Sequence, residues 1–259
     1  MCDAQTRRLV LDALALLNPR GKAQPSPLQI TIALGCQAEE LDQAFVRVLG
    51  QPASQLLPLL TPEHLTSLIA PLIAPLSPRP RLELIHSERS EAEELTLLYD
   101  YYDSPYGELL LVCSERGLCM SPFTYGDPAG TLERVRRELR PLELRRAQHP
   151  WHEGALRSLH STDPHPELPP LHLLGTPFQR SVWESLTLIP RGSCVHYHTL
   201  ADYIDRPKAT RAVGTAVGDN PLAPFVPCHR VLPTSNTLGG YYWGHALKAL
   251  LLLSELRPA

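Results

Sequence analysis

Cys228 and His229 are adjacent, and this pair has the residue types for covalent chemistry. A thiol has a reference pKa of about 8.5 and is mostly protonated at neutral pH, so a nucleophilic cysteine needs a nearby base or positive group. His229 can be that base, directly or through a water molecule. Such a histidine is usually oriented by a carboxylate on its other nitrogen, and Glu255 in the helical run "HALKALLLLSELR" is the candidate. The pattern predicts a Cys-His-Glu triad, and a core cysteine beside a surface histidine is the alternative.

The residues before the thiol predict its environment. Pro227 and the apolar run "APFV" precede Cys228, which would hold the thiol away from bulk water on a fixed backbone. A conventional cysteine hydrolase is not favoured, because "VPCHRV" does not resemble the strand-to-helix turn that carries a hydrolase nucleophile.

The surrounding segments carry a family resemblance. The chain contains, in order, "GTPFQ", "VW", "IPRG", "RPKATRAVG", "NP", "VPCHRV", "GGY" and "LLLSE". From Gly175 to Arg257 it resembles the methylated-DNA-protein-cysteine methyltransferases, or O6-alkylguanine-DNA alkyltransferases. The run "SPYGELLL" followed by "SERGL" resembles the smaller N-terminal domain of that family, which extends the likeness to residues 95–257.

The resemblance implies a suicide DNA-repair enzyme. Such an enzyme moves the methyl or larger alkyl group of O6-methylguanine, and of O4-methylthymine, irreversibly onto its own cysteine, here Cys228. His229 would be the water-relayed base, Glu255 would orient it, and Asn220 would brace the turn before the active-site strand. The thioether product is stable, so one molecule repairs one lesion. The implied partner is double-stranded DNA, and no metal or organic cofactor is implied.

The resemblance also implies how DNA is bound. The family lays the second helix of a helix-turn-helix in the minor groove and rotates the damaged nucleotide into the pocket. The segment "RPKATRAVGTAVG" matches that helix, and Arg211 matches the residue that fills the gap left by the base. Small residues at 209, 212, 214 and 216 would let the helix approach the backbone. The other DNA- or substrate-binding residues implied are Tyr197, Ala209, Thr210, Gly214, Val231, Tyr241, Tyr242 and Trp243.

Two departures from the family pattern stand near these residues. Trp243 replaces a small residue, and "TSNT" replaces a short glycine-containing turn, which predicts a changed tolerance for bulky alkyl groups. Cys194 and His196 are also unusual, and the sequence suggests no function for them.

The N-terminal segment predicts a small helical module. Leu9, Leu11, Leu14, Leu16 and Leu17 can share one face of a helix that ends at Pro19, and the next run reads as helix, tight turn at Gly35, helix. The apolar residues expected on the faces of that pair are Leu28, Ile32, Leu34, Leu41, Phe45 and Val48.

This helix pair resembles half of the DNA-binding domain of AraC-type regulators. The expected reading helix carries Glu39, Glu40 and Asp42 against Arg47, the wrong sign for phosphate contacts, so a degenerate packing module is favoured. The alternative is an alkylation-responsive transcriptional regulator that reads DNA through this module.

The middle of the chain predicts a β-hairpin around "DSPYGE" and a helix at "TLERVRREL". The following Pro-rich region carries histidines 149, 152, 160, 165 and 172, which are expected in exposed loops, with a metal site as the lesser alternative. Residues 58–80 are apolar and rich in proline, which predicts a packed linker.

The composition and charge of the chain limit the classes of protein to which it can belong. The net charge of −3 gives no overall basic excess, so any DNA contact must be local. Six scattered cysteines do not form a disulfide framework, and no apolar run approaches the roughly 20 residues of a membrane-spanning helix. We expect a monomeric cytoplasmic protein, nucleoid-associated when it acts.

The expected fold is α/β with an added α module, in three domains. They are a helix-turn-helix module with its linker (residues 1–75), a ribonuclease-H-like α/β domain (90–172) and a winged-helix-like catalytic alkyltransferase domain (174–259).

Overall fold

The computed structural model describes residues 4–18, 24–61, 63–64, 82–161, 163 and 166–256. Most of the predicted linker, Pro19 and His165 lie outside these residues. The chain groups into two compact units. The first comprises Met1–Pro71, Pro190–Tyr197 and His229–Ala259, and the second comprises Leu72–Ile189 and His198–Cys228. The domain boundaries expected from the sequence stay predictions.

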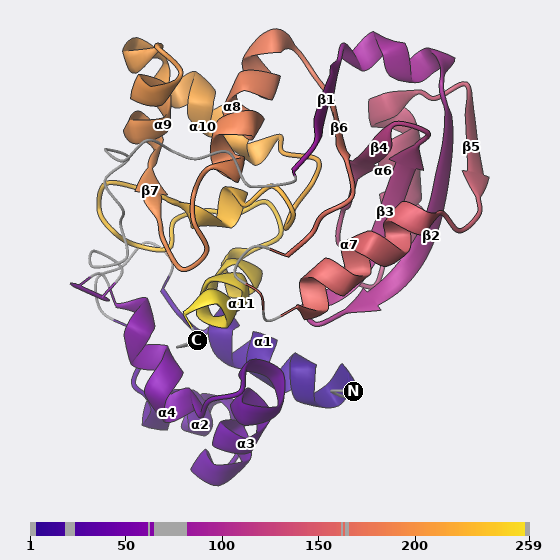
Figure 1. The fold of residues 1–259 in the computed structure, drawn as a ribbon. Coiled ribbons are helices and arrows are strands. Elements are labelled where there is room, and N and C mark those ends of the chain that lie inside the picture. Colours follow the sequence, from indigo (N-terminus) through magenta and orange to yellow (C-terminus); the bar gives the residue numbers. More distant parts are fainter. Residues whose placement is uncertain are drawn as a thin grey trace. The chain divides into compact units, whose positions relative to one another are not determined.

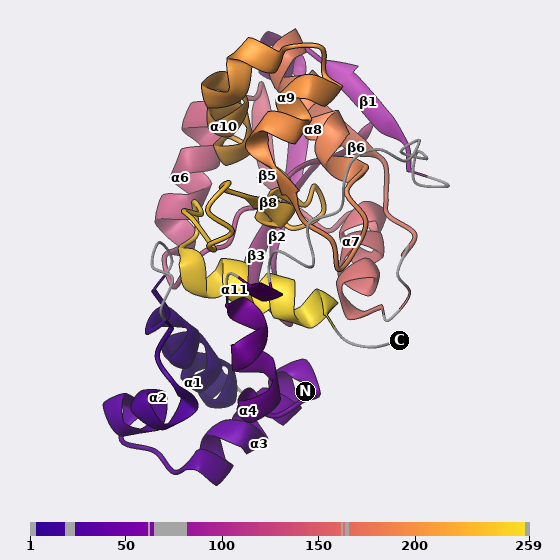
Figure 2. The same ribbon diagram turned by 90° about the vertical axis from the view of Figure 1, so that its left-hand side faces the viewer.

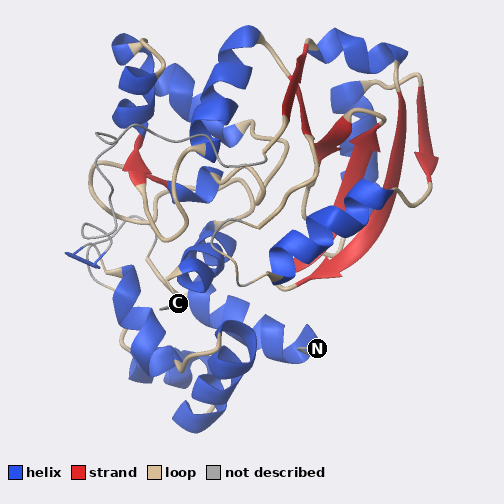
Figure 3. Ribbon diagram, viewed as in Figure 1, coloured by secondary structure: helices blue, strands red, loops and turns tan. Residues whose placement is uncertain are grey.

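A six-stranded mixed sheet forms the centre of the second unit (Figures 1 and 3). Its strand order is β1-β6-β4-β3-β2-β5. The strands are β1 (Leu84–Ser87), β2 (Thr96–Ser104), β3 (Gly107–Ser114), β4 (Gly117–Met120), β5 (Glu143–Arg146) and β6 (Leu171–Leu174). Strands β2 and β3 pair in antiparallel register, which confirms the predicted hairpin. A further strand, β4, pairs with β3, because the chain turns back between Ser114 and Gly117.

Two helices cover this sheet on opposite faces, as Figure 2 shows. Helix α6 (Pro128–Leu139) is the predicted charged helix, and its Val135 and Leu139 enter the core with Leu97, Leu110 and Val112 of the sheet. Helix α7 (Pro150–His160) contacts β2, β3 and β4. A 3-10 helix, η2 (Arg89–Glu94), precedes β2.

Helix α7 corrects the expectation of exposed loop histidines. Proline fits the first position of a helix, where its missing N–H is not needed, so Pro150 begins α7 where the sequence suggested an irregular segment. His152 is buried in this helix and His172 is buried in β6. His149 caps α7, with its Nδ1 3.2 Å from the Trp151 amide, and His160 at the helix end is exposed as expected.

The rest of the second unit is helical. It contains α8 (Pro177–Thr187), most of α9 (Tyr197–Tyr203), the 3-10 turn η3 (Pro207–Ala209) and α10 (Thr210–Gly218). Trp183 is fully buried in α8, and its indole Nε1 donates to the carbonyl oxygen of Ala216 in α10 at 2.8 Å. A Cβ atom at Gly175 would come within 2.6 Å of the Trp183 ring, so this position requires glycine. Trp183 therefore fixes α10 against α8.

The first unit contains the N-terminal helices and the C-terminal helix. They are α1 (Ala4–Ala15), α2 (Pro27–Leu34), α3 (Ala38–Leu49), α4 (Ala53–Leu56), the 3-10 turn η1 (Leu57–Leu60) and α11 (His245–Glu255). Two short strands, β7 (Val195–His196) and β8 (Val231–Leu232), pair in parallel in the same unit.

The expected helix, turn and helix are present at α2 and α3. Gly35 ends α2 with φ of 65°, a left-handed conformation that glycine adopts without strain. The expected apolar faces are only partly right. Leu41, Phe45, Leu14 and Leu17 are buried, whereas Leu28, Ile32 and Leu16 are 68%, 71% and 41% exposed. Periodicity identified the helices but not which face of each is covered.

The acidic residues of α3 have local structural partners. Glu39 and Glu40 lie in the first turn, where the helix dipole favours negative charge. Asp42 accepts hydrogen bonds from the amide and hydroxyl of Ser54 at 3.0 and 3.2 Å. Within the described part of the chain, no helix is long and apolar enough to cross a membrane.

Candidate active site

Cys228 ends the second unit and is 5% exposed. It begins the 3-10 turn η4 (Cys228–Arg230), and its amide donates to the Val226 carbonyl at 2.9 Å. Asn220 is buried and braces the segment before it. The Asn220 side chain donates to the Val226 carbonyl at 2.7 Å and accepts from the Leu222 amide at 3.0 Å. The backbone that leads to the thiol is therefore fixed by side-chain hydrogen bonds.

Ser121 also holds this segment, and no pattern in the sequence predicts this role. Ser121 follows β4 directly; its amide donates to the Pro221 carbonyl and its hydroxyl to the Ala223 carbonyl, both at 2.9 Å. The sheet of the second unit is thereby tied to the loop that precedes Cys228.

His229, Arg230 and Glu255 form a buried network in the first unit. His229 Nε2 lies 2.8 Å from Glu255 Oε1. Arg230 donates to both carboxylate oxygens, from Nη2 to Oε1 at 2.8 Å and from Nε to Oε2 at 2.9 Å. The Gly192 amide reaches Oε2 at 3.3 Å. His229 Nδ1 is buried and has no hydrogen-bond partner among the described residues.

The charges of this network suit a neutral imidazole. Burial lowers the pKa of His229, and the adjacent Glu255 opposes that shift only in part. Burial alone would raise the pKa of Glu255, but Arg230 and His229 hold it well below its usual range. Glu255 is therefore ionised and His229 is neutral at pH 7. A neutral imidazole bound at Nε2 can accept a proton at Nδ1.

Lys248 and Cys194 lie near the same buried network. Lys248 is 1% exposed, and its Nζ donates to the Val231 carbonyl at 2.8 Å, which holds β8 to α11. Burial raises the pKa of the Cys194 thiol to about 12, with Glu255 contributing, so this thiol stays protonated. His196 Nδ1 lies 3.3 Å from the Leu232 carbonyl. Cys194 and His196 thus belong to the β7 and β8 packing behind the network.

The residues expected on the DNA-reading helix divide between two environments. Arg211 and Ala212 are exposed on α10, and Thr210, Gly214 and Ala209 are half-buried. Ala216 is only 2% exposed and faces Trp183. The expectation that Ala216 lies on the DNA-facing side is therefore corrected.

The remaining predicted residues are the aromatic segment 241–243, Val231 and Tyr197. Tyr242 is 61% exposed and Trp243 is 8% exposed, and the Trp243 ring packs against Tyr241 and Tyr242 at centroid distances of 5.6 and 5.0 Å. Val231 is fully buried, and its carbonyl oxygen accepts the hydrogen bond from Lys248. Tyr197 begins α9 and is half-buried.

Comparison with known proteins identifies the family. The model described as "6-O-methylguanine DNA methyltransferase, DNA binding domain" matches residues 177–257, and the "ribonuclease-like domain" model of the same enzyme matches residues 97–139. The chain is 37% identical to the methylated-DNA-protein-cysteine methyltransferase of Methanosarcina barkeri over 167 residues. That match covers 61% of this chain and 97% of the relative. The chain belongs to the methylated-DNA-protein-cysteine methyltransferase family.

Other members of this family extend the comparison. The "Bifunctional transcriptional activator/DNA repair enzyme Ada" of Escherichia coli is 39% identical over 173 residues, which cover 64% of this chain and 48% of Ada. The chain spans about half the length of the first curated relatives that it matches. The crystal structure of the Mycobacterium tuberculosis O6-methylguanine methyltransferase aligns with a TM-score of 0.51 at 34% identity, covering 63% of this chain and 96% of that one.

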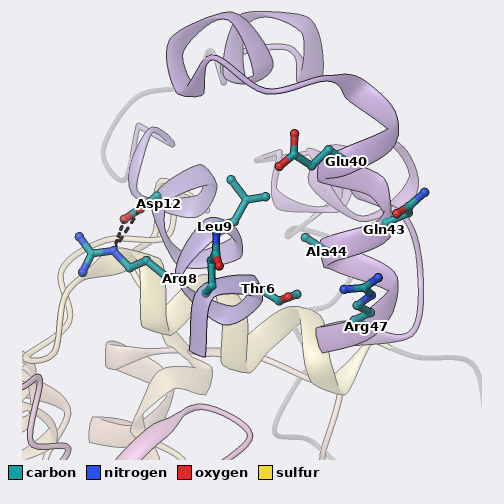
Figure 4. Close-up of a pocket in the computed structure, with 9 residues that line it drawn as sticks. Thr6, Arg8, Leu9, Asp12, Glu40, Gln43, Ala44 and Arg47 are labelled. Carbon is teal, nitrogen blue, oxygen red and sulfur yellow. Dashed lines mark hydrogen bonds and ion pairs between the residues drawn. The ribbon is translucent and has the colours of Figure 1, made fainter. Parts of the chain in front are cut away.

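A pocket of about 460 Å³ is lined by residues outside the segments that the family models match. It is lined by α1 and α3, including Arg8, Asp12, Glu40 and Arg47 (Figure 4). Arg8 and Asp12 form an exposed ion pair at 2.9 Å along its wall. Both family models lie outside these helices.

Proposed function

We propose that this protein repairs alkylated DNA by transferring the alkyl group of O6-methylguanine, and of O4-methylthymine, to its own Cys228. The observation that carries the proposal is the state of His229. Its Nε2 is held by an ionised carboxylate and its Nδ1 has no hydrogen-bond partner among the described residues. This base directly follows a buried cysteine in the chain.

In the proposed reaction, His229 Nδ1 accepts the thiol proton of Cys228, directly or through a water molecule. The Cys228 sulfur then attacks the alkyl carbon in line with the bond to guanine O6. The carbon–oxygen bond breaks, and its electron pair leaves with the guanine. The guanine then takes up a proton equivalent to the one lost by the thiol. Glu255 stabilises the imidazolium formed in between. The thioether remains on the protein, so each molecule acts once.

The proposed partner is double-stranded DNA with the damaged nucleotide rotated out of the helix. Arg211 is exposed near the start of α10, and we infer that it fills the gap left by the base. A long planar cation suits this position because it can stack and donate hydrogen bonds. Exposed Ala212 and half-buried Gly214 keep the helix surface small.

Intact mass spectrometry tests the proposal. The protein is incubated with a duplex that contains one O6-methylguanine, beside a Cys228→Ala control. We expect a gain of one methyl group, mapped to Cys228 and stoichiometric with repair, in the unmutated protein alone. A modified alanine variant or an unmodified wild-type protein would contradict the assignment.

The fold of two segments, the oligomeric state and the cellular location are also proposals. We infer that residues 90–172 form a ribonuclease-H-like domain, that residues 174–259 form a winged-helix-like domain, and that the protein acts as a monomer in the cytoplasm. The sheet flanked by α6 and α7 supports the first assignment. Light scattering on the purified protein tests the monomer.

We further infer that residues 1–75 are a degenerate AraC-like module that does not read DNA. The exposed Glu39 and Glu40 on α3 support this over a transcriptional role. If the module did bind promoter DNA, Arg47→Ala would lower the salt dependence of duplex affinity, because it would remove a contact between a cationic side chain and a phosphate. We expect no such effect from Arg47→Ala, whereas Arg211→Ala should lower duplex affinity because it removes the side chain that fills the gap left by the base.

A further inference from the structure

Helix α11 has no face open to solvent along most of its length. Eight consecutive residues, Leu247 to Ser254, are buried. At about 3.6 residues per turn, eight residues cover the helix surface more than twice around. A helix that is buried on every side needs a packing partner on every side.

Helix α1 is one of those partners. Helices α1 and α11 are in contact, and they lie side by side in both Figure 1 and Figure 2. Turn η1 also contacts α11. His245, the first residue of α11, has its Nε2 3.0 Å from the carbonyl oxygen of Ala15, the last residue of α1. The N-terminal helices and α11 therefore share one compact unit.

The two sides of α1 differ in character. Val10, Ala13 and Leu14 are buried, whereas Arg8 and Asp12 line the open pocket of Figure 4. Both family models begin after residue 60, at residues 97 and 177. The helix that covers α11 is thus supplied from outside the segments that define the family.

Helix α11 ends at Glu255, so its position sets the position of the carboxylate. The Ser254 carbonyl accepts from Arg191 Nη2 at 3.2 Å, and Lys248 ties the middle of the helix to the Val231 carbonyl at 2.8 Å. Glu255 Oε1 must lie within hydrogen-bond distance of His229 Nε2, at 2.8 Å. A small shift of α11 along its axis would separate those two atoms.

We propose that helix α1 is a positioning element for alkyl transfer, which holds α11 so that Glu255 meets His229. This inference rests on the proposed function, because it assigns α1 a part in the same reaction. The N-terminal helices then act on catalysis without contacting DNA or the reacting atoms.

The test compares variants of the full-length protein in single-turnover alkyl transfer at saturating duplex. Leu14→Ala opens a cavity on the buried side of α1, and Leu16→Ala, in the turn directly after this helix, is the control because Leu16 is 41% exposed. His245→Ala removes the contact to Ala15, and His245→Gln restores a side-chain N–H donor. Each rate is measured at a temperature where the variant is fully folded.

We expect Leu14→Ala and His245→Ala to transfer the methyl group about tenfold more slowly, since a displacement of about 1 Å by a remote mutation can cost up to about 100-fold. Leu16→Ala and His245→Gln should match the wild type, and duplex affinity should be the same for all variants. That pattern separates positioning from a loss of DNA binding.

Wild-type rates in folded Leu14→Ala and His245→Ala would overturn the inference and leave the proposed function intact. If Leu14→Ala does not fold, the comparison of His245→Ala with His245→Gln decides the question. A wild-type protein that transfers no methyl group would overturn the proposed function, and this inference with it.

Discussion

Substitutions in the buried Arg230–Glu255 pair should change the stability of the protein and its rate of alkyl transfer in different ways. Glu255→Gln removes the charge that faces Arg230 Nε and Nη2 at 2.9 and 2.8 Å, and the Arg230 side chain is only 5% exposed. An uncompensated buried charge costs about 3–5 kcal/mol. With a urea dependence of about 3 kcal/mol per molar, the denaturation midpoint should fall by roughly 1–2 M.

The double variant Arg230→Met with Glu255→Gln should recover much of that loss. Replacing both members of a buried ion pair leaves no unpaired charge and is often close to neutral in stability. Alkyl transfer should not recover, because His229 Nε2 still lacks its carboxylate. Positioned acid–base groups contribute about 10²- to 10⁴-fold, so we expect transfer at least about 100-fold slower in both proteins.

Urea denaturation and single-turnover methyl transfer on the wild type, Glu255→Gln, Arg230→Met and the double variant check this reasoning. If the loss of stability in the double variant equals the sum of the losses in the two single variants, the pair is not a coupled buried unit. Wild-type transfer by the double variant would show that Glu255 does not orient the base.

Three further predictions concern other parts of the molecule. Trp183→Phe removes the hydrogen bond to the Ala216 carbonyl and should lower the free energy of unfolding by about 1–3 kcal/mol, and an unchanged urea midpoint would contradict this. Burial lowers the pKa of His172 to about 4, so its contribution to stability is complete above pH 6.5 and is lost as the pH falls towards 4. His172→Asn should flatten the stability profile between pH 6.5 and pH 4. A profile identical to that of the wild type would show that His172 does not cause this loss of stability. Trp243→Gly should speed transfer from O6-benzylguanine relative to O6-methylguanine, whereas an unchanged ratio of rates would show that Trp243 does not limit substrate size.

Local patterns predicted the elements that carry the chemistry. The turn residues around Pro105 predicted the β2–β3 hairpin, and the apolar run before Glu255 predicted helix α11. The pairing of His229 with Glu255 was also expected, because a histidine base is usually oriented by a carboxylate.

Long-range partners were not predictable from the same patterns. Ser121 is an ordinary polar residue in sequence, and only the folded chain brings it to the Ala223 carbonyl. The apolar residues Leu28 and Ile32 were expected inside, but a helical repeat does not say whether a neighbour covers each face. The burial of His152 was not predicted, because a proline-rich pattern indicates irregular structure, whereas Pro150 is the first residue of a helix.

The contact between Ala15 and His245 joins residues that are 230 positions apart in the chain. Bringing such distant segments together has an entropic cost that grows slowly with their separation, and native contacts of this kind slow folding. During synthesis from the N-terminus, α1 emerges from the ribosome long before the helix that it covers. Helices α2 and α3, which also contact α1, follow it directly in the chain. The part of α1 that packs against α11 must remain uncovered, or be shielded by other proteins, until translation reaches the segment that contains Glu255.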